Sequence, residues 1–387
     1  MMNYKLYLKC IVLLVLVAAC SKSKKKPEII FDMPVRSVTI PALGGEEILD
    51  VDANVDWNVD CEADWITAVK LNNDQLKITV SATIPGRSAG VICRVDDKSI
   101  SVTVTQMAAP ATQADSLALV ALYRATGGET WANRWTLSQP VKQWYGVIVS
   151  GGRVTELDLH ANNLVGTLPA EINYLTELKY LDLFDNALSG ELPDLGKLTK
   201  LIIVDLSHNQ FSGTLSAWIS KLSSLAHIEL RNNYLQGELP AGLKNLPNLH
   251  TLDLSHNAFS GTMPAAWSSL TKLRICYLYA NELSGELPSY LSNFSNLDSL
   301  ALDGNNFTGT VPNGLGNITS LSGLWLRQNQ LTGSVPGDLL NNANWNRWRI
   351  HVVDQQNGVV LQEGTQAPAQ LQSRSFIREL PKPRKER

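Results

Sequence analysis

The chain has 387 residues, a formal net charge of −3, 44% hydrophobic residues and 18% charged residues. This length and composition predict a folded protein with two or three domains. Lysine and arginine collect at the two ends of the chain, which leaves an acidic body. An acidic body argues against a nucleic-acid partner, because such a partner requires a clustered basic face.

The N-terminus has the pattern of a secretory signal over residues 1–19. Lys5 and Lys9 precede an apolar run at residues 11–19, which is shorter than the roughly 20 residues that span a bilayer. The sequence VAAC at residues 17–20 resembles the lipobox of bacterial lipoproteins. That resemblance implies acylation of Cys20, a tether over residues 20–27, and a lipid-anchored protein of the Gram-negative cell envelope. It places the anchor in the outer membrane, with the periplasmic or surface side left open. A plain signal peptide is the alternative.

Residues 28–107 contain about seven short segments of alternating apolar and polar residues, separated by turn residues. This pattern predicts a small Ig-like β-sandwich. Trp57, Trp65, Arg87 and Gln106 lie in an order that resembles a BACON domain, a family whose name proposes carbohydrate binding. A spacer role is the favoured interpretation. Strand parity places Cys61 and Cys93 toward one core, so a disulfide between them is left open.

Residues 108–114 are predicted to be a linker, and residues 115–153 an N-terminal cap. Asp115 is expected to cap a helix that runs through Leu117 and Leu122. Trp131, Trp135 and Trp144 are expected to brace the cap.

Residues 154–341 repeat one pattern, L-x-x-L-x-L-x-x-N-x-L-x-G-x-L-P, in eight copies spaced by 24 residues, and once by 23. A fixed period of this length indicates a solenoid. The LxGxLP segment resembles the plant-type leucine-rich repeat, which implies a right-handed coil with a parallel concave sheet. A structural role, bonding the backbone of the turn, is predicted for the repeated asparagine: Asn162, Asn186, Asn209, Asn233, Asn257, Asn281, Asn305 and Asn329.

Residues 342–364 are predicted to be a C-terminal cap with two strand-like runs, and residues 365–387 a disordered basic tail. The predicted fold is therefore a β-rich multidomain protein: an Ig-like sandwich followed by a leucine-rich repeat solenoid with a helical N-terminal cap. It is expected to be a monomer.

Side chains between the strand leucines point out of the sheet, onto its concave side. Because neighbouring strands lie about 4.8 Å apart, the acidic residues among them should form a continuous strip. Exposed tyrosine, tryptophan and arginine are typical of binding hot spots. The candidate ligand-binding residues are Asp182, Asp205, Glu229, Asp253, Phe184, Arg231, Tyr277, Tyr279, Trp325 and Arg327.

The chain contains no G-x-S-x-G, H-E-x-x-H, G-x-x-x-x-G-K-[ST] or C-x-x-C motif. We therefore expect no enzyme activity, no catalytic residues, no cofactor and no metal; a pairing such as His160 with Asp182 is expected only by chance. The favoured function is binding of a protein ligand on the concave face. The alternative is capture of a glycan, by the concave-face aromatic residues or by the sandwich.

Overall fold

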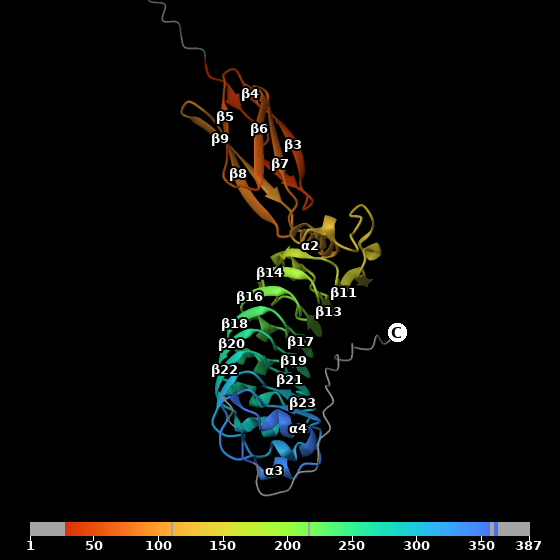
Figure 1. Ribbon diagram of the computed structural model, residues 1–387. Coiled ribbons are helices and arrows are strands. Elements are labelled where there is room, and N and C mark those ends of the chain that lie inside the picture. The colour runs from red at the N-terminus through yellow and green to blue at the C-terminus, as the bar shows by residue number, and fades with distance from the viewer. Residues whose placement is uncertain (1–27, 110, 216, 357–359, 363–387) are drawn as a thin grey trace, which may run out of the picture. The chain divides into compact units, whose positions relative to one another are not determined.

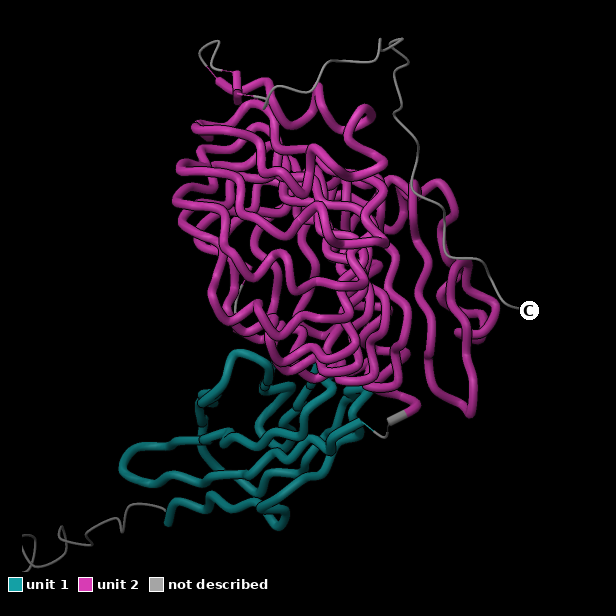
Figure 2. The backbone as a smooth tube through the Cα atoms, turned by 90° about the horizontal axis from the view of Figure 1, so that it is seen from below, with its two compact units in different colours: residues 1–109 teal, residues 110–387 magenta. Residues whose placement is uncertain are grey.

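The computed structural model describes residues 28–109, 111–215, 217–356 and 360–362. The chain divides into two compact units, Met1–Ala109 and Pro110–Arg387 (Figure 2). The predicted signal sequence, Cys20 with its tether, and the basic tail lie outside the described residues.

The first unit is built from mainly antiparallel sheets that enclose one apolar core (Figure 1). Its strands are β1 (Phe31–Asp32), β2 (Ser37–Ile40), β3 (Gly45–Asp50), β4 (Asp52–Ala53), β5 (Asn58–Cys61), β6 (Ile66–Asn72), β7 (Gln75–Val80), β8 (Arg87–Val95) and β9 (Lys98–Gln106). The sheets have the strand orders β2-β9-β8-β5, β3-β7-β6 and β1-β4, and β2 pairs with β9 in parallel. The alternating residues of β7 and β9 face the core, as their period of two predicts.

The four positions that resembled a BACON domain have structural contacts in this unit. Trp57 is only 2% exposed, and its indole N–H donates to the Asn73 carbonyl at 2.8 Å. The Arg87 guanidinium lies 4.3 Å from the ring centroid of Trp65, and its Nε donates to Gln106 Oε1 at 2.9 Å. These contacts hold strands and loops of the unit to one another.

Cys61 and Cys93, the cysteines among the described residues of this unit, are free thiols. Cys93 is fully buried, whereas Cys61, at the end of the edge strand β5, is exposed. The expectation that both face one core is therefore wrong for Cys61.

The second unit begins with helix α2 (Ala111–Ala125), followed by the short helices η1 (Gly128–Thr130) and η2 (Val141–Gln143). The helix starts four residues before Asp115, so Asp115 is not its cap, and residues 111–114 are helix rather than linker. Instead, the buried Asp115 carboxylate accepts from Arg153 Nε and Nη2, at 2.9 and 2.8 Å, and from the Val154 N–H at 2.8 Å. This pair ties the cap to the first repeat.

Three tryptophans fill the space beyond α2. Trp131 and Trp135 meet edge to face with centroids 4.8 Å apart, and Trp135 stacks on Trp144 at the same distance. Tyr123 of α2 extends the row, with its centroid 5.1 Å from that of Trp131. The aromatic cluster supplies the bracing that the sequence predicted for these residues.

Two sheets run the length of the solenoid (Figure 1). The nine-stranded sheet contains β10 (Val147–Ser150), β11 (Arg153–Asp158), β13 (Tyr180–Asp182), β15 (Ile203–Asp205), β17 (His227–Glu229), β19 (Thr251–Asp253), β21 (Ile275–Tyr277), β23 (Ser299–Ala301) and β25 (Gly323–Trp325). The seven-stranded sheet contains β12 (Val165–Thr167), β14 (Ala187–Glu191), β16 (Gln210–Thr214), β18 (Tyr234–Glu238), β20 (Ala258–Gly261), β22 (Glu282–Glu286) and β24 (Asn306–Thr308). Apart from β10, which is antiparallel, neighbouring strands pair in parallel.

Most turns continue from the seven-stranded sheet into a short 3₁₀ helix. These helices are η3 (Ala170–Tyr174), η4 (Ala217–Lys221), η5 (Ala241–Asn245), η6 (Ala265–Ser269), η7 (Ser289–Asn293) and η8 (Leu315–Asn317). Gly213 shows why the pattern needs glycine: its φ is +78°, and an added Cβ would lie 2.8 Å from Cγ of Glu191 in the preceding turn. None of the described helices has the length and apolar content needed to cross a bilayer.

The repeated asparagines link consecutive turns through their side-chain amides. Asn209 Nδ2 donates to the carbonyl of Leu183 in the preceding turn at 2.9 Å and to that of Leu206 at 3.1 Å, while its Oδ1 accepts from the Leu188 N–H. The donor bond to the preceding turn recurs at Asn186, Asn209, Asn233, Asn257, Asn281, Asn305 and Asn329. Asn162, in the first turn, instead accepts from the Asn133 N–H at 2.6 Å.

The C-terminal end is closed by helices α3 (Gly337–Leu340) and α4 (Trp345–Val352). The prediction of a strand-like run at the position of α4 is wrong: Trp345, Trp348 and Val352 are buried at helical spacing. Backbone carbonyls at the end of α4 and just after it accept hydrogen bonds from residues that directly follow β25, the last strand of the nine-stranded sheet. The Leu326 N–H donates to the His351 carbonyl at 2.7 Å, and the Gln328 N–H donates to that of Asp354 at 2.9 Å.

Candidate functional site

The outward side of the nine-stranded sheet, called the open face here, carries three columns of side chains in register. In the middle column, Asp158 is paired with Asp182, Asp182 with Asp205, Asp205 with Glu229, and Glu229 with Asp253. The column continues through Tyr277, Ala301 and Trp325. The predicted alignment of the acidic residues as nearest neighbours is therefore confirmed.

Several carboxylates of this column also hold the end of their own strand. Asp182 Oδ1 accepts from the Phe184 N–H at 2.9 Å, and Asp205 Oδ1 from the Ser207 N–H at the same distance. Asp253 makes the corresponding bond to Ser255 at 3.0 Å. One oxygen of each of these aspartates is thus occupied by the backbone.

Burial weakens the charge of the acidic strip. Desolvation, reinforced by the neighbouring Asp205 and Asp253, raises the pKa of Glu229 to about 8, although Arg231 opposes the shift. Desolvation likewise raises the pKa of Asp205 to about 6 and raises that of Asp182 and Asp253. These four carboxyl groups of the strip are therefore harder to ionise than exposed ones would be.

Asp253 does not lie on the exposed surface that was predicted for it. Its side chain and those of Thr251 and Ser255 are buried, with Asp253 only 2% exposed. Larger residues flank this repeat on both sides, with Glu229 and Tyr277 as the register neighbours of Asp253. The burial of Asp253 removes it from contact with a ligand in this arrangement.

The aromatic residues of the open face form two groups. Tyr277 and Tyr279 meet edge to face with centroids 6.2 Å apart. Trp325 lies two strands from Tyr277, and its ring covers Gly323, where an added Cβ would lie 2.3 Å from the indole. Its centroid is also 6.0 Å from that of His351 in α4. The terminal helix thus contacts one predicted ligand residue, and Ala301 of the intervening strand lies between that residue and Tyr277 in the register.

Arg327 lies beside Asp303 at this end of the face. Burial raises the pKa of Asp303 to about 7, and Arg327 opposes the shift. Among the described residues, Arg327 Nε and Asp303 Oδ1 are nevertheless buried without a hydrogen-bond partner. These two atoms therefore interact through charge and do not bond each other directly.

Phe184 and Arg231 are brought together by His208, a residue that the sequence did not single out. Arg231 Nη2 lies 2.7 Å from His208 Nε2, and the ring centroids of Phe184 and His208 are 5.1 Å apart. His208 has a φ of +55°, and the residue before the asparagine is left-handed in every repeat. In other repeats this position is occupied by Asp185, Asn232 and Gly304, residue types that tolerate the left-handed region. Their recurrence before the asparagine is the sequence signal that could have indicated the backbone conformation of His208.

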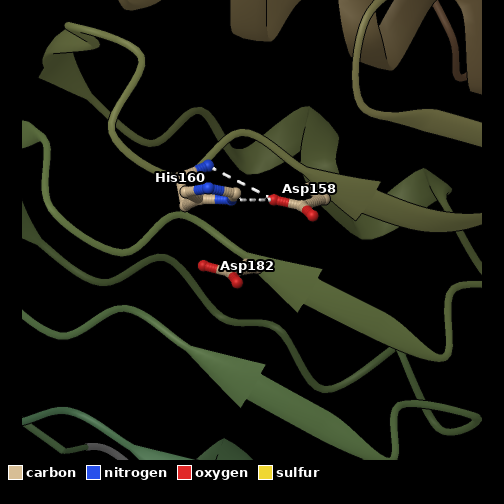
Figure 3. Close-up of side chains that lie close together, drawn as sticks. All are labelled: Asp158, His160 and Asp182. Carbon is tan, nitrogen blue, oxygen red and sulfur yellow. Dashed lines mark hydrogen bonds and ion pairs between the residues drawn. The ribbon is translucent and has the colours of Figure 1, made fainter. Parts of the chain in front are cut away.

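Asp158, His160 and Asp182 meet at the N-terminal end of the open face (Figure 3). His160 Nδ1 lies 2.5 Å from Asp158 Oδ1, and one potential ligand atom from each residue lies within 4.8 Å of the other two. The sequence allowed a chance pairing of His160 with Asp182 in this register, and the structure brings the two residues into one cluster with Asp158.

Comparison with known proteins identifies the repeats. A family model described as Leucine Rich Repeat matches residues 177–198, 200–222, 224–246, 248–270 and 296–318. The chain contains leucine-rich repeats of the plant receptor type. Receptor-like kinase TMK4 of Arabidopsis thaliana is 39% identical over 67 residues, and Probable inactive receptor kinase At1g48480 of the same plant is 40% identical over 99 residues. These matches cover 17% and 24% of this chain but only 7% and 15% of the relatives.

A solved structure extends the likeness beyond the matched segments. The leucine-rich repeat ectodomain of the Arabidopsis receptor kinase HAESA, in complex with a peptide hormone ligand, is 28% identical with a TM-score of 0.54. The alignment covers 64% of this chain and 41% of that one. The repeat region thus resembles the ectodomain of a plant peptide hormone receptor.

These comparisons correct the predicted location. The matched relatives are plant receptor kinases and the similar structure is a receptor ectodomain, so the prediction of a Gram-negative cell envelope is wrong. That prediction depended on a four-residue pattern around Cys20, which lies outside the described residues.

Proposed function

We propose that the second unit binds a protein or peptide ligand on the open face of its nine-stranded sheet. The observation that carries the proposal is the continuous strand register from Asp158 to Trp325. Along it, side chains that differ from repeat to repeat project from a backbone that is the same in each repeat. Such a surface is rigid before binding, so little ordering entropy is lost when a ligand docks. The likeness to the HAESA ectodomain, which was solved with a peptide hormone ligand, supports the same class of ligand.

The central part of the open face has the side chains that are best suited to binding a peptide. Tyr277 and Tyr279 are half-buried, and their rings support each other in fixed positions. Arg231 is oriented by its contact with His208 on the neighbouring repeat. Preorganised tyrosine and arginine side chains of this kind are enriched among residues that dominate binding energy. Asp182 and Asp205 remain half-buried and provide an acidic flank to this region.

A test starts from the full chain and a phage-displayed library of random linear peptides. Peptides selected on the wild-type protein are synthesised, and their affinity is measured for Tyr277→Ala and Tyr279→Ala. Truncation of a hot-spot residue costs about 2 kcal/mol or more, so we expect affinity to fall at least about 30-fold.

Tyr234→Ala is the matched control, because Tyr234 is 65% exposed and belongs to the seven-stranded sheet. Selected peptides that bind Tyr277→Ala and Tyr279→Ala as tightly as the wild type, or that lose affinity only for Tyr234→Ala, would refute the open face as the ligand site.

Carbohydrate capture is the second candidate, and the contacts favour it less. Gly323 and His351 occupy part of the Trp325 surface on which a sugar ring would stack, and Trp57 of the first unit is buried. A glycan array probed with the full chain distinguishes the candidates: specific glycan retention that Tyr277→Ala abolishes would favour this alternative over a peptide ligand.

For the first unit we propose an Ig-like, BACON-like spacer without its own ligand. The support is that Trp57, Trp65, Arg87 and Gln106 contact one another or the core, as described above. We also propose that the chain is not an enzyme, because its sequence contains none of the catalytic motifs considered above.

A further inference from the structure

Three residues of two neighbouring repeats converge at the N-terminal end of the open face. Asp158 ends β11, and His160 follows it by two residues, so both side chains emerge on the same side of the sheet. Asp182 ends the neighbouring strand β13 and is the register partner of Asp158. Figure 3 shows the imidazole of His160 and the two carboxylates turned toward a common space.

This space is open to an ion from solvent. All three residues are half-buried, and the side chains of His160 and Asp158 are 42% and 27% exposed. One nitrogen and two carboxylate oxygens lie within 4.8 Å of one another. Ligand atoms around a first-row metal ion lie about 2.0–2.2 Å from it, so small side-chain rotations would bring all three into contact with one ion.

The two carboxylates also lack a permanent counterion. Across the described residues, neither Asp158 nor Asp182 has a lysine or arginine within ion-pairing distance, and His160 is the sole basic partner of Asp158. Elsewhere in the same repeats, Glu177 pairs with Lys200, with 2.5 Å between Oε2 and Nζ. Two adjacent half-buried carboxylates without such a cation repel each other, and a bound cation would remove that repulsion.

The Asp182 carboxylate is held from outside the cluster. Tyr180 donates its hydroxyl to Asp182 Oδ2 at 2.8 Å, and the Phe184 N–H donates to Oδ1 at 2.9 Å. Outer partners that fix a carboxylate in this way are a regular feature of metal sites and contribute to their affinity. Tyr180 is therefore assigned a positioning role.

We propose that Asp158, His160 and Asp182 bind one divalent transition-metal ion of the Zn²⁺ class. A mixed set of one imidazole nitrogen and two carboxylates suits these ions, whereas Ca²⁺ and Mg²⁺ prefer oxygen ligands throughout. Three protein ligands leave at least one coordination position for water or for a group of a bound partner. The proposal is independent of the proposed peptide ligand, because the ion binds to the chain alone.

The test uses the full chain without an affinity tag, stripped of metal with a chelator. Isothermal titration calorimetry with Zn²⁺ is expected to show one site. His160→Gln and Asp182→Asn should each weaken it at least about tenfold, and Tyr180→Phe by about tenfold, because an outer partner is lost. Co²⁺ provides a second readout, since its visible absorption reports nitrogen and oxygen ligands directly and should change in His160→Gln.

The matched control is His227→Gln, a histidine of the same face whose Nδ1 contacts Thr251 Oγ1 rather than a carboxylate. It should leave the Zn²⁺ affinity unchanged, and circular dichroism should show that every variant is folded. The proposal is overturned if the wild type shows no Zn²⁺ site, or if folded His160→Gln and Asp182→Asn bind Zn²⁺ as the wild type does. An equal loss in His227→Gln would also overturn it.

Discussion

Glu229→Gln should stabilise the solenoid, and the gain should depend on pH. Glu229 lies in the acidic strip between its register neighbours Asp205 and Asp253. Their charges and that of Asp182, two strands away, disfavour its ionisation, whereas Arg231 favours it. Glutamine keeps the size and shape of the side chain but cannot ionise. The substitution therefore isolates the cost of placing a negative charge at this position.

The magnitude follows from the difference between the folded and unfolded pKa values. Burial raises the pKa of Glu229 from 4.5 to about 8, so the folded state holds the proton more tightly than the unfolded state does. Folding stability is then unaffected below pH 4.5, falls as the pH rises toward 8, and is constant above it. Each pKa unit corresponds to about 1.4 kcal/mol, which sets an upper limit of about 5 kcal/mol for the gain at pH 9.

Urea unfolding with pulsed hydrogen exchange measures this gain, because peptides from β17 and β19 report the solenoid separately from the first unit. We expect no difference between Glu229→Gln and the wild type at pH 4, and a gain of several kcal/mol at pH 9. Glu238→Gln, on an exposed position of β18, should stay within about 0.5 kcal/mol at both pH values. An equal effect of Glu229→Gln at pH 4 and pH 9 would show that charge burial is not the cause.

Three further tests probe the packing of the second unit by urea or thermal unfolding. Asp115→Asn should cost about 3–5 kcal/mol, because it leaves the Arg153 guanidinium without its buried partner; a loss below about 1 kcal/mol would contradict this. Asn305→Ala should cost about 1–3 kcal/mol, since it leaves the buried Leu283 N–H without its partner, whereas the Leu278 and Leu302 carbonyls keep their bonds from Asn281 and Asn329; a loss below about 1 kcal/mol would mean that water replaces the bond to Leu283. Gly304→Ala should cost only about 1 kcal/mol, because its φ is +59° and no atom lies within 3.7 Å of the new Cβ. Gly146→Ala should cost several times more, because the new Cβ would lie 1.9 Å from a backbone oxygen; equal losses for the two glycines would refute this comparison.

The repeat and its register could be predicted from sequence because both follow from spacing. A constant interval between Asn209, Asn233 and Asn257 places equivalent residues on neighbouring strands whatever the variable side chains are. The exposure of those variable side chains does not follow from spacing. Asp253 is buried although Asp205 and Glu229 of the same column are only half-buried, and Trp325 contacts His351 because a later helix folds back onto it.

Local patterns were ambiguous where the repeat ends. Residues 345–353 alternate well enough to suggest a strand, but Trp345, Trp348 and Val352 fit a helical face equally well, and the structure forms α4. At the other end, Asp115 resembles a helix cap because aspartate is common there. Its actual partner, Arg153, is 38 residues away, and no local pattern indicates such a contact.

The closure of the C-terminal end has a consequence for self-association. A parallel sheet of stacked coils ends in a row of unpaired backbone groups, which could accept the first coil of another copy. Such a contact is head to tail, so repeating it would produce an open-ended filament. In this chain the carbonyls of His351 and Asp354 accept the N–H groups of Leu326 and Gln328, which blocks growth at that edge.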